Sequence, residues 1–175
     1  ICADAVPQLT GANIPFAIRA RVVLLRDLGA PLSPFNAFQI IQGLETVALR
    51  MKQHCVNAEK VVAFLETQKK VTNVIYPTNH QGEIKERAKR YMQGGYGSLV
   101  GMDVGTREAG SKFIDNLKML YHVANIGDAR SLAIHPATTT HSQLNDEELL
   151  AAGVTPGYVR LSIGIEHPDD IISDI

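Results

Sequence analysis

Side chains capable of acid–base, metal or hydrogen-bond chemistry are concentrated in residues 122–142, HVANIGDARSLAIHPATTTHS. The stretch alternates polar residues with weak apolar runs and has no helical or strand period. Irregular segments of this length are uncommon in compact domains unless they serve a function. The structural alternative is a set of turns and caps, in which Asn and Asp side chains bond to their own backbone. The residue types alone leave both interpretations open.

Two catalytic interpretations of this stretch find little support. His135, His141 and Asp128 could ligate a metal, but their spacing matches no motif that places ligands on one helical face. Ser131 or Ser142 could pair with a histidine in a hydrolase, but no G-x-S-x-G turn is present. We therefore expect neither a metal centre nor a serine hydrolase.

Arg160 stands apart because it lies within an apolar run, between Val159 and Leu161. In a strand its side chain points to the face opposite theirs. An unpaired buried charge costs several kcal/mol, about 3–5, so the guanidinium requires an anionic partner. A carboxylate of the chain, such as Asp128 or Glu166, would satisfy it. So would the carboxylate of a substrate, which the planar guanidinium can bind through two hydrogen bonds.

The composition describes a globular chain without a strong charge. It has 175 residues and 19.1 kDa, with 17 Lys and Arg against 18 Asp and Glu. This balance gives no electrostatic case for nucleic acid, and no apolar run approaches the roughly 20 residues of a membrane span. The two cysteines, Cys2 and Cys55, are too few for a disulfide scaffold. We expect a reducing cytosol and no nucleic-acid or membrane partner.

The first part of the chain predicts a helical arm. Residues 14–28 carry a broad apolar face, and Gly29 is placed to end that helix. Ser33 and Pro34 form an N-cap followed by proline at the first helical position. A helix over 34–67 would be about 50 Å long at 1.5 Å per residue. We expect it to be kinked, with Gly43 as the candidate, or to link two bodies.

The remainder predicts a small α/β layer. The predicted elements are strands at 71–76, 98–104 and 158–163, a short extended run at 120–123, and helices at 83–93, at 106–118, after Asn145 and after Pro168. Asn145 and Glu148 have the spacing of a capping box. Residues 124–145 are predicted to form a long loop.

An ordered set of motifs resembles the pyridoxal-phosphate (PLP) enzymes of cysteine and methionine metabolism. The motifs are RDLGA (26–30), LSPFNAF (32–38), GLET (43–46), LRM (49–51), ANIGD (124–128), SL (131–132), IHPA (134–137), TTHSQL (139–144) and VRLSIGIE (159–166). Within this family the chain is most similar to the branch of O-acetylhomoserine sulfhydrylases. The match covers nearly the whole chain, and the set is far more specific than any single motif.

The resemblance implies an α/β fold, the C-terminal part of a fold-type I PLP enzyme. Residues 1–33 would end the large PLP-binding domain. Residues 34–69 would be a long connecting helix, and 70–175 a small C-terminal α/β domain with a mainly antiparallel sheet. The implied assembly is a cytoplasmic homo-oligomer, a tetramer in the family. In the implied reaction of methionine biosynthesis, sulfide replaces the acetate of O-acetyl-L-homoserine and gives L-homocysteine.

Three residues carry over as a substrate-binding set: Arg160, Asn125 and Ser131. Arg160 matches the family arginine that binds the substrate α-carboxylate. Asn125 matches a position beside the same carboxylate that is serine in the related lyases, and its side chain or its backbone could make the contact. Ser131 lies in a matching motif, where we expect it to be architectural rather than catalytic. The S-x-T-K-type motif of the Schiff-base lysine is absent from these residues, so we expect the 175-residue chain by itself to hold no PLP and to be inactive.

Two other functions compete with this one. Cystathionine γ-synthase or γ-lyase chemistry occurs on the same fold, although Asn125 in place of serine argues modestly against the lyases. A non-catalytic binding domain is the alternative from another class, and it predicts a stable 19.1 kDa monomer. The enzyme interpretation predicts instead an exposed apolar surface on residues 14–28 and 34–67.

Overall fold

The computed structural model describes residues 14–175 and separates two compact units, which meet in sequence between Glu45 and Thr46. The boundary falls within the segment 34–69 that was predicted as a connecting helix. The described helices of the first unit are α2 (Pro15–Arg19), η1 (Ala20–Leu28) and α3 (Pro34–Glu45).

The predicted helical arm is confirmed within the described part of the first unit. Pro15 occupies the first turn of α2, and Gly29 ends η1 with φ 69°, donating its N–H to the carbonyl of Leu25 at 3.0 Å. The second half of this helix is a π-helix instead of an α-helix. The Ser33 hydroxyl accepts a hydrogen bond from the N–H of Asn36 at 3.2 Å, as expected for the cap of α3.

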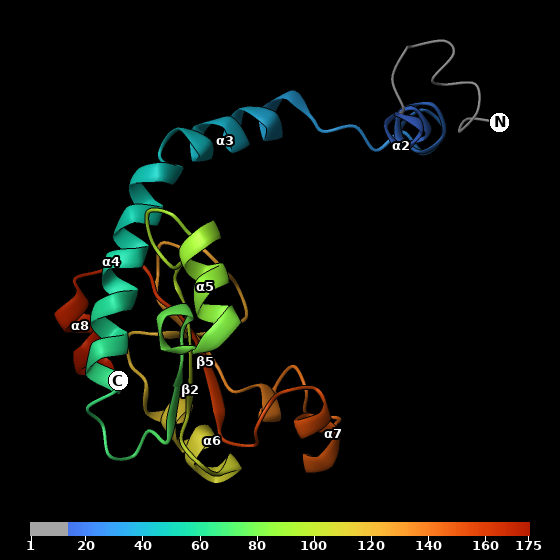
Figure 1. Ribbon diagram of the computed structural model, residues 1–175. Helices are drawn as coiled ribbons and strands as arrows, with labels where there is room; N and C mark the ends of the chain where they lie inside the picture. Colours follow the sequence, from blue (N-terminus) through green and yellow to red (C-terminus); the bar gives the residue numbers. More distant parts are fainter. Residues whose placement is uncertain (1–13) are drawn as a thin grey trace. The chain divides into compact units, whose positions relative to one another are not determined.

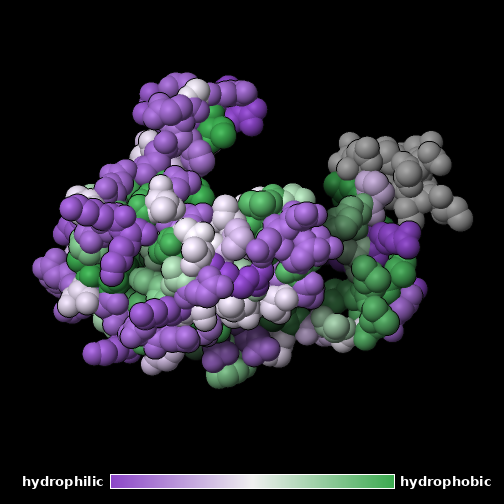
Figure 2. Space-filling view, turned by 90° about the horizontal axis from the view of Figure 1, so that it is seen from below, coloured by the Kyte–Doolittle hydropathy of each residue, from purple (hydrophilic) through white to green (hydrophobic). Residues whose placement is uncertain are grey.

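None of the described residues in α2, η1 and α3 is buried. Phe16 is 85% exposed and Leu28 is 77% exposed, and Phe35, Phe38 and Leu44 are more than half exposed. Figure 2 shows such apolar residues in green, among them a group on α2 and η1. Apolar side chains in these numbers need a covering surface in the protein to which the unit belongs.

The long helix predicted over 34–67 is interrupted, but not at Gly43. Gly43 lies inside α3, whereas Thr46 leaves the helical dihedrals with φ −108° and ψ 4°. A second helix, α4 (Val47–Leu65), starts directly after it, and the N–H of Arg50 bonds to the carbonyl of Thr46 at 3.0 Å. Thr46 is thus the N-cap residue of α4.

The second unit is built on a five-stranded mixed sheet (Figure 1). Its strands are β1 (Asn73–Ile75), β2 (Leu99–Asp103), β3 (Tyr121–His122), β4 (Leu132–Ile134) and β5 (Tyr158–Ser162). The order is β1-β2-β5-β4-β3, and every neighbouring pair is antiparallel except β3 and β4. The expectation of a mainly antiparallel sheet is therefore confirmed.

Strand β4 corrects the prediction that residues 124–145 form one long loop. All three of its residues are buried, so it shows no alternation of apolar and polar positions. Three buried residues are also too few to distinguish a strand from a helix by sequence. β4 pairs with β5 and with β3, and it divides the polar stretch into a loop before it and a loop after it.

Helices complete the second unit. They are α4, α5 (Gly82–Tyr91), α6 (Arg107–Asn116), α7 (Asp146–Ala151) and α8 (Pro168–Asp174), with short 3-10 turns η2 (Pro77–Asn79) and η3 (Pro136–Thr138). α4 and α8 lie side by side (Figure 1). Ala58, Val61 and Leu65 of α4 join the side chains of β2 and β5 in one apolar core. Within residues 14–175, no helix has the length and apolar character that crossing a membrane requires.

Candidate functional site

Arg160 lies in the centre of the sheet on β5, paired with Gly101 of β2 on one side and Ile134 of β4 on the other. Its Nη2 donates a hydrogen bond to the carbonyl oxygen of Asn125 at 3.3 Å. Its Nε is buried and has no hydrogen-bond partner in the described part of the chain. A central strand thus presents a guanidinium with an unused, desolvated donor.

The carboxylates offered by the sequence as partners for Arg160 are engaged elsewhere. Asp128 accepts a hydrogen bond from the N–H of Arg130 at 3.0 Å, and Glu166 accepts two from Ser131. Among the ion pairs formed by residues 14–175, none includes Arg160. Neither carboxylate pairs with Arg160 within residues 14–175, so the alternative of an ion pair with Asp128 or Glu166 is wrong.

Tyr158 lies two residues before Arg160 and shares its face of the strand. A Cβ on Gly101, the residue paired with Arg160, would lie 2.7 Å from the Tyr158 ring, so only glycine leaves room for the tyrosine there. Burial raises the pKa of Tyr158, and the nearby charge of Arg160 offsets only part of this rise. Beside the guanidinium, Tyr158 is thus a neutral hydrogen-bonding group at physiological pH.

Asn125 is exposed and contacts Arg160 through its backbone. Its side-chain Oδ1 accepts the N–H of Ile126 at 2.9 Å, which turns the chain locally. Its Nδ2 donates to nothing within residues 14–175. In this structure the backbone carbonyl of Asn125 therefore contacts the arginine, while its amide nitrogen is an unused donor on an exposed residue.

Ser131 is fully buried and does not reach Arg160. Its N–H and its hydroxyl donate to the two carboxylate oxygens of Glu166, at 2.6 and 2.9 Å. Its hydroxyl also accepts the N–H of Gly164 at 2.8 Å. The geometry gives Ser131 an architectural place, joining the loop that starts at Asn125 to the segment that follows β5.

Two buried polar residues of α4 support the same segment and were missed by sequence analysis. His54 Nδ1 lies 2.6 Å from the carbonyl oxygen of Ile163. Asn57 Nδ2 donates to the carbonyls of Gly164 and Glu166, at 3.0 and 2.8 Å. The available signal was their spacing of three residues on the apolar face of a helix, which is unusual for polar side chains that are fully buried.

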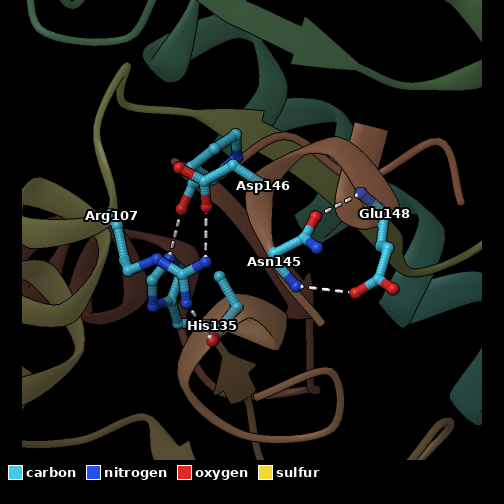
Figure 3. Close-up of polar contacts among 7 residues, drawn as sticks. Arg107, His135, Asn145, Asp146 and Glu148 are labelled. Atoms are coloured by element: carbon cyan, nitrogen blue, oxygen red, sulfur yellow. Dashed lines mark hydrogen bonds and ion pairs between the residues drawn. The ribbon is translucent and has the colours of Figure 1, made fainter. Parts of the chain in front are cut away.

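The loop after β4, which contains His135 and His141, is held by structural contacts. In Figure 3 the Arg107 guanidinium faces Asp146, its Nη2 lying 2.6 Å from the carboxylate, and its Nη1 donates to the carbonyl of Ala137 at 2.6 Å. Burial lowers the pKa of His135, although its Nε2 donates to the carbonyl of Pro156 at 2.8 Å. Its Nδ1 lies 3.0 Å from the hydroxyl of Thr138, so this neutral imidazole is held on both sides and serves as a packing group. Within 14–175 no cluster of three or more His, Cys, Asp or Glu could hold a metal ion.

Comparisons with known proteins agree on one family. The model for the Cys/Met metabolism PLP-dependent enzymes matches residues 9–175. O-acetyl-L-homoserine sulfhydrylase of Leptospira meyeri is 52% identical over 167 residues, which are 94% of this chain and 38% of that protein. Homocysteine synthase of Schizosaccharomyces pombe is 42% identical over 94% of this chain and 39% of its own length.

A solved structure is similar to this chain and is named as the same type of enzyme. It is a candidate O-acetylhomoserine (thiol)-lyase of Campylobacter jejuni that carries a pyridoxyl-lysine monophosphate. The TM-score is 0.84 at 42% identity, and the match covers 95% of this chain and 40% of that one. The chain therefore spans about two fifths of the length of these relatives.

Proposed function

The chain belongs to the Cys/Met metabolism PLP-dependent enzyme family, and we propose that it is the C-terminal part of an O-acetyl-L-homoserine sulfhydrylase, in which it binds the substrate α-carboxylate. The reaction replaces the acetate of O-acetyl-L-homoserine by sulfide and yields L-homocysteine. A relative that carries this name at 52% identity supports the proposal.

Bound PLP supplies an electron sink for removing protons next to the substrate amine. The S-x-T-K-type lysine motif does not occur in these 175 residues. We place that lysine in the part of the enzyme outside this chain. The residues described here would act on the substrate instead: they hold its carboxylate and thereby set which face of the amino acid is presented.

The observation that carries the proposal is the Nε of Arg160, buried and without a partner. Asn125 uses one N–H of Nη2, and the remaining donors form one edge of a planar fork. A carboxylate fits that edge through two charge-assisted hydrogen bonds, each about twice as strong as a neutral one. It would also neutralise a charge that the described chain leaves unpaired. The Nδ2 of Asn125, on an exposed residue that contacts Arg160, could supply a second donor for the same anion.

We extend the proposal to the assembly. The apolar side chains exposed along α2, η1 and α3 require cover from the rest of the subunit or from neighbouring subunits. This supports a homo-oligomer, for which we propose a tetramer, over a stand-alone binding domain. The buried free thiol of Cys55 is compatible with the reducing cytoplasm that we propose as its compartment.

The test uses the full-length protein loaded with PLP. Arg160→Ala should lower kcat/KM for O-acetyl-L-homoserine by about ten- to hundredfold, because a hydrogen bond to a charged group contributes about 1.5–3 kcal/mol. The cofactor absorbance should not change. Arg87→Ala is the matched control, since this arginine is exposed on α5 and pairs with Glu83 of the same helix. Normal kcat/KM in the Arg160 variant would show that the carboxylate is bound elsewhere.

The neighbouring chemistries are separated by the nucleophile. We expect homocysteine when sulfide is supplied, and little product when L-cysteine is supplied or when no nucleophile is present. Cystathionine from cysteine, or a keto acid without any nucleophile, would instead assign the chain to the synthase or the lyase type. Asn125→Ser should alter KM without changing the folded state, and unchanged kinetics would remove Asn125 from the site.

A further inference from the structure

The carboxylate of Glu166 joins two backbone segments that flank Arg160. One is the loop 125–131, which begins at the carbonyl that contacts the guanidinium. The other is the segment 163–166, which leaves β5 immediately after it. Both oxygens of Glu166 accept hydrogen bonds from Ser131, at 2.6 and 2.9 Å, and they close the loop onto this segment.

The loop 125–131 and the segment 163–166 are in close backbone contact, and helix α4 also binds the segment. The N–H of Ile165 donates to the carbonyl of Ala129 at 2.9 Å. A Cβ on Gly164 would lie 2.5 Å from that same carbonyl oxygen, so the two backbones are in direct contact. Asn57 of α4 binds the carbonyls of Gly164 and Glu166, which ties the segment to the helix. The loop can therefore move little while Glu166 is in place.

The negative charge of Glu166 is also important, because it could form an ion pair with Arg160. An acidic side chain six residues after Arg160 could turn towards the guanidinium and occupy the edge meant for a ligand. The two donors of Ser131 hold it in another direction, and no ion pair forms between Glu166 and Arg160. Ser131 and Glu166 together keep the arginine oriented and uncompensated.

We propose that Glu166 is a positioning residue for the carboxylate site: through Ser131 and the loop 125–131 it holds the Asn125 carbonyl against Arg160 and so presets the guanidinium for a carboxylate ligand. The inference rests on the proposed function for the identity of that ligand. Glu166 itself touches neither ligand nor arginine. Removing its carboxylate should leave the guanidinium of Arg160 less firmly oriented. Misplacement of a binding group by about 1 Å can reduce catalysis about a hundredfold.

The experiment compares two amines on the full-length, PLP-loaded protein. L-2-Aminobutyrate carries the carboxylate and propylamine lacks it, and the absorbance of the cofactor reports the binding of each. In Glu166→Ala the Kd for aminobutyrate should rise roughly ten- to hundredfold, while the Kd for propylamine stays unchanged. Glu166→Gln retains an oxygen that accepts the N–H of Ser131, so it should restore most of the affinity. If the alanine variant does not fold, the glutamine variant and Ser131→Ala are compared in its place and should show smaller losses of the same selectivity.

Asp174→Asn is the matched control, because this carboxylate also accepts backbone N–H groups, those of residues 118–120, but belongs to another loop. It should leave the ratio of the two affinities unchanged. Equal losses for both amines in Glu166→Ala, or no loss for either amine, would overturn the positioning role. If Arg160→Ala does not weaken aminobutyrate binding relative to propylamine binding, the proposed carboxylate site fails. If Arg160→Ala weakens aminobutyrate binding selectively but Glu166→Ala does not, only the present inference fails.

Discussion

Gly164→Ala is the most direct test of the contact between the loop 125–131 and the segment 163–166, which flank Arg160. An added Cβ would lie 2.5 Å from the carbonyl oxygen of Ala129 and 2.6 Å from the carbonyl carbon of Arg130, and it would overlap the carboxylate of Glu166. Two of these three obstacles are main-chain atoms and cannot rotate away. The loop must therefore move as a body, away from the segment that follows β5.

The cost can be estimated from the contacts. Forcing an extra methyl group into a filled space costs about 1–3 kcal/mol. If the hydrogen bond from Ile165 to Ala129 is lost, about 0.5–1.5 kcal/mol is removed, and if that from Ser131 to the Glu166 carboxylate is lost, about 1.5–3 kcal/mol. Because such terms are not additive, we expect the local opening free energy to fall by about 2–4 kcal/mol.

Amide hydrogen exchange of the full-length protein measures this quantity region by region. Since 1.4 kcal/mol is a factor of ten, protection of the amides of Ser131, Gly164 and Ile165 should fall roughly 30- to 1000-fold. Helix α6 should retain its protection. Ile165→Val, which removes one methyl group from an exposed side chain, should change little. Wild-type protection in the alanine variant would refute the idea that this contact is tightly packed and holds the loop.

Three further predictions concern the frame around the site. Gly110→Ala should destabilise the protein by about 1–3 kcal/mol, because the new Cβ would overlap the buried and hydrogen-bonded ring of His135; unfolding by urea measures it, and a neutral result would contradict the close packing of α6 on this ring. Asn145→Ala should remove about 1 kcal/mol by breaking the capping box of α7, visible as faster exchange in that helix alone. Burial by itself raises the pKa of Asp174, but hydrogen bonds from three consecutive N–H groups outweigh it and lower the pKa below its ordinary value. Its contribution is therefore present at neutral pH and is lost as the pH falls through the lowered value, so thermal midpoints of wild type and Asp174→Asn should differ at pH 7 and converge in strong acid.

Local features of this fold could be predicted because each depends on a few neighbouring residues. Pro34 after Ser33, Thr106 before α6 and the pair Asn145 and Glu148 start their helices as their spacing indicates. Strands β2 and β5 follow from runs of apolar residues. The prediction failed where the local signal is weak: β4 is three buried residues, and the break before α4 occurs at Thr46 instead of Gly43.

Arg160 shows how far the sequence alone reaches. An arginine between Val159 and Leu161 calls for an anion wherever both faces of its strand are covered, because burying an unpaired charge is costly. The ordered motifs also indicated the family, which the comparisons confirm. These conclusions depend on residue type and order along the chain, and both are read directly from the sequence.

Only the tertiary structure shows that neither nearby carboxylate pairs with Arg160. Asp128 and Glu166 were equally available in sequence, and the fold turns one towards Arg130 and the other towards Ser131. The contact from Asn125 to Arg160 spans 35 residues, and the support from Asn57 to Glu166 spans 109. Pairings over such separations are set by how strands and helices pack, because no local propensity links residues that meet only after the sheet and α4 have formed a common core.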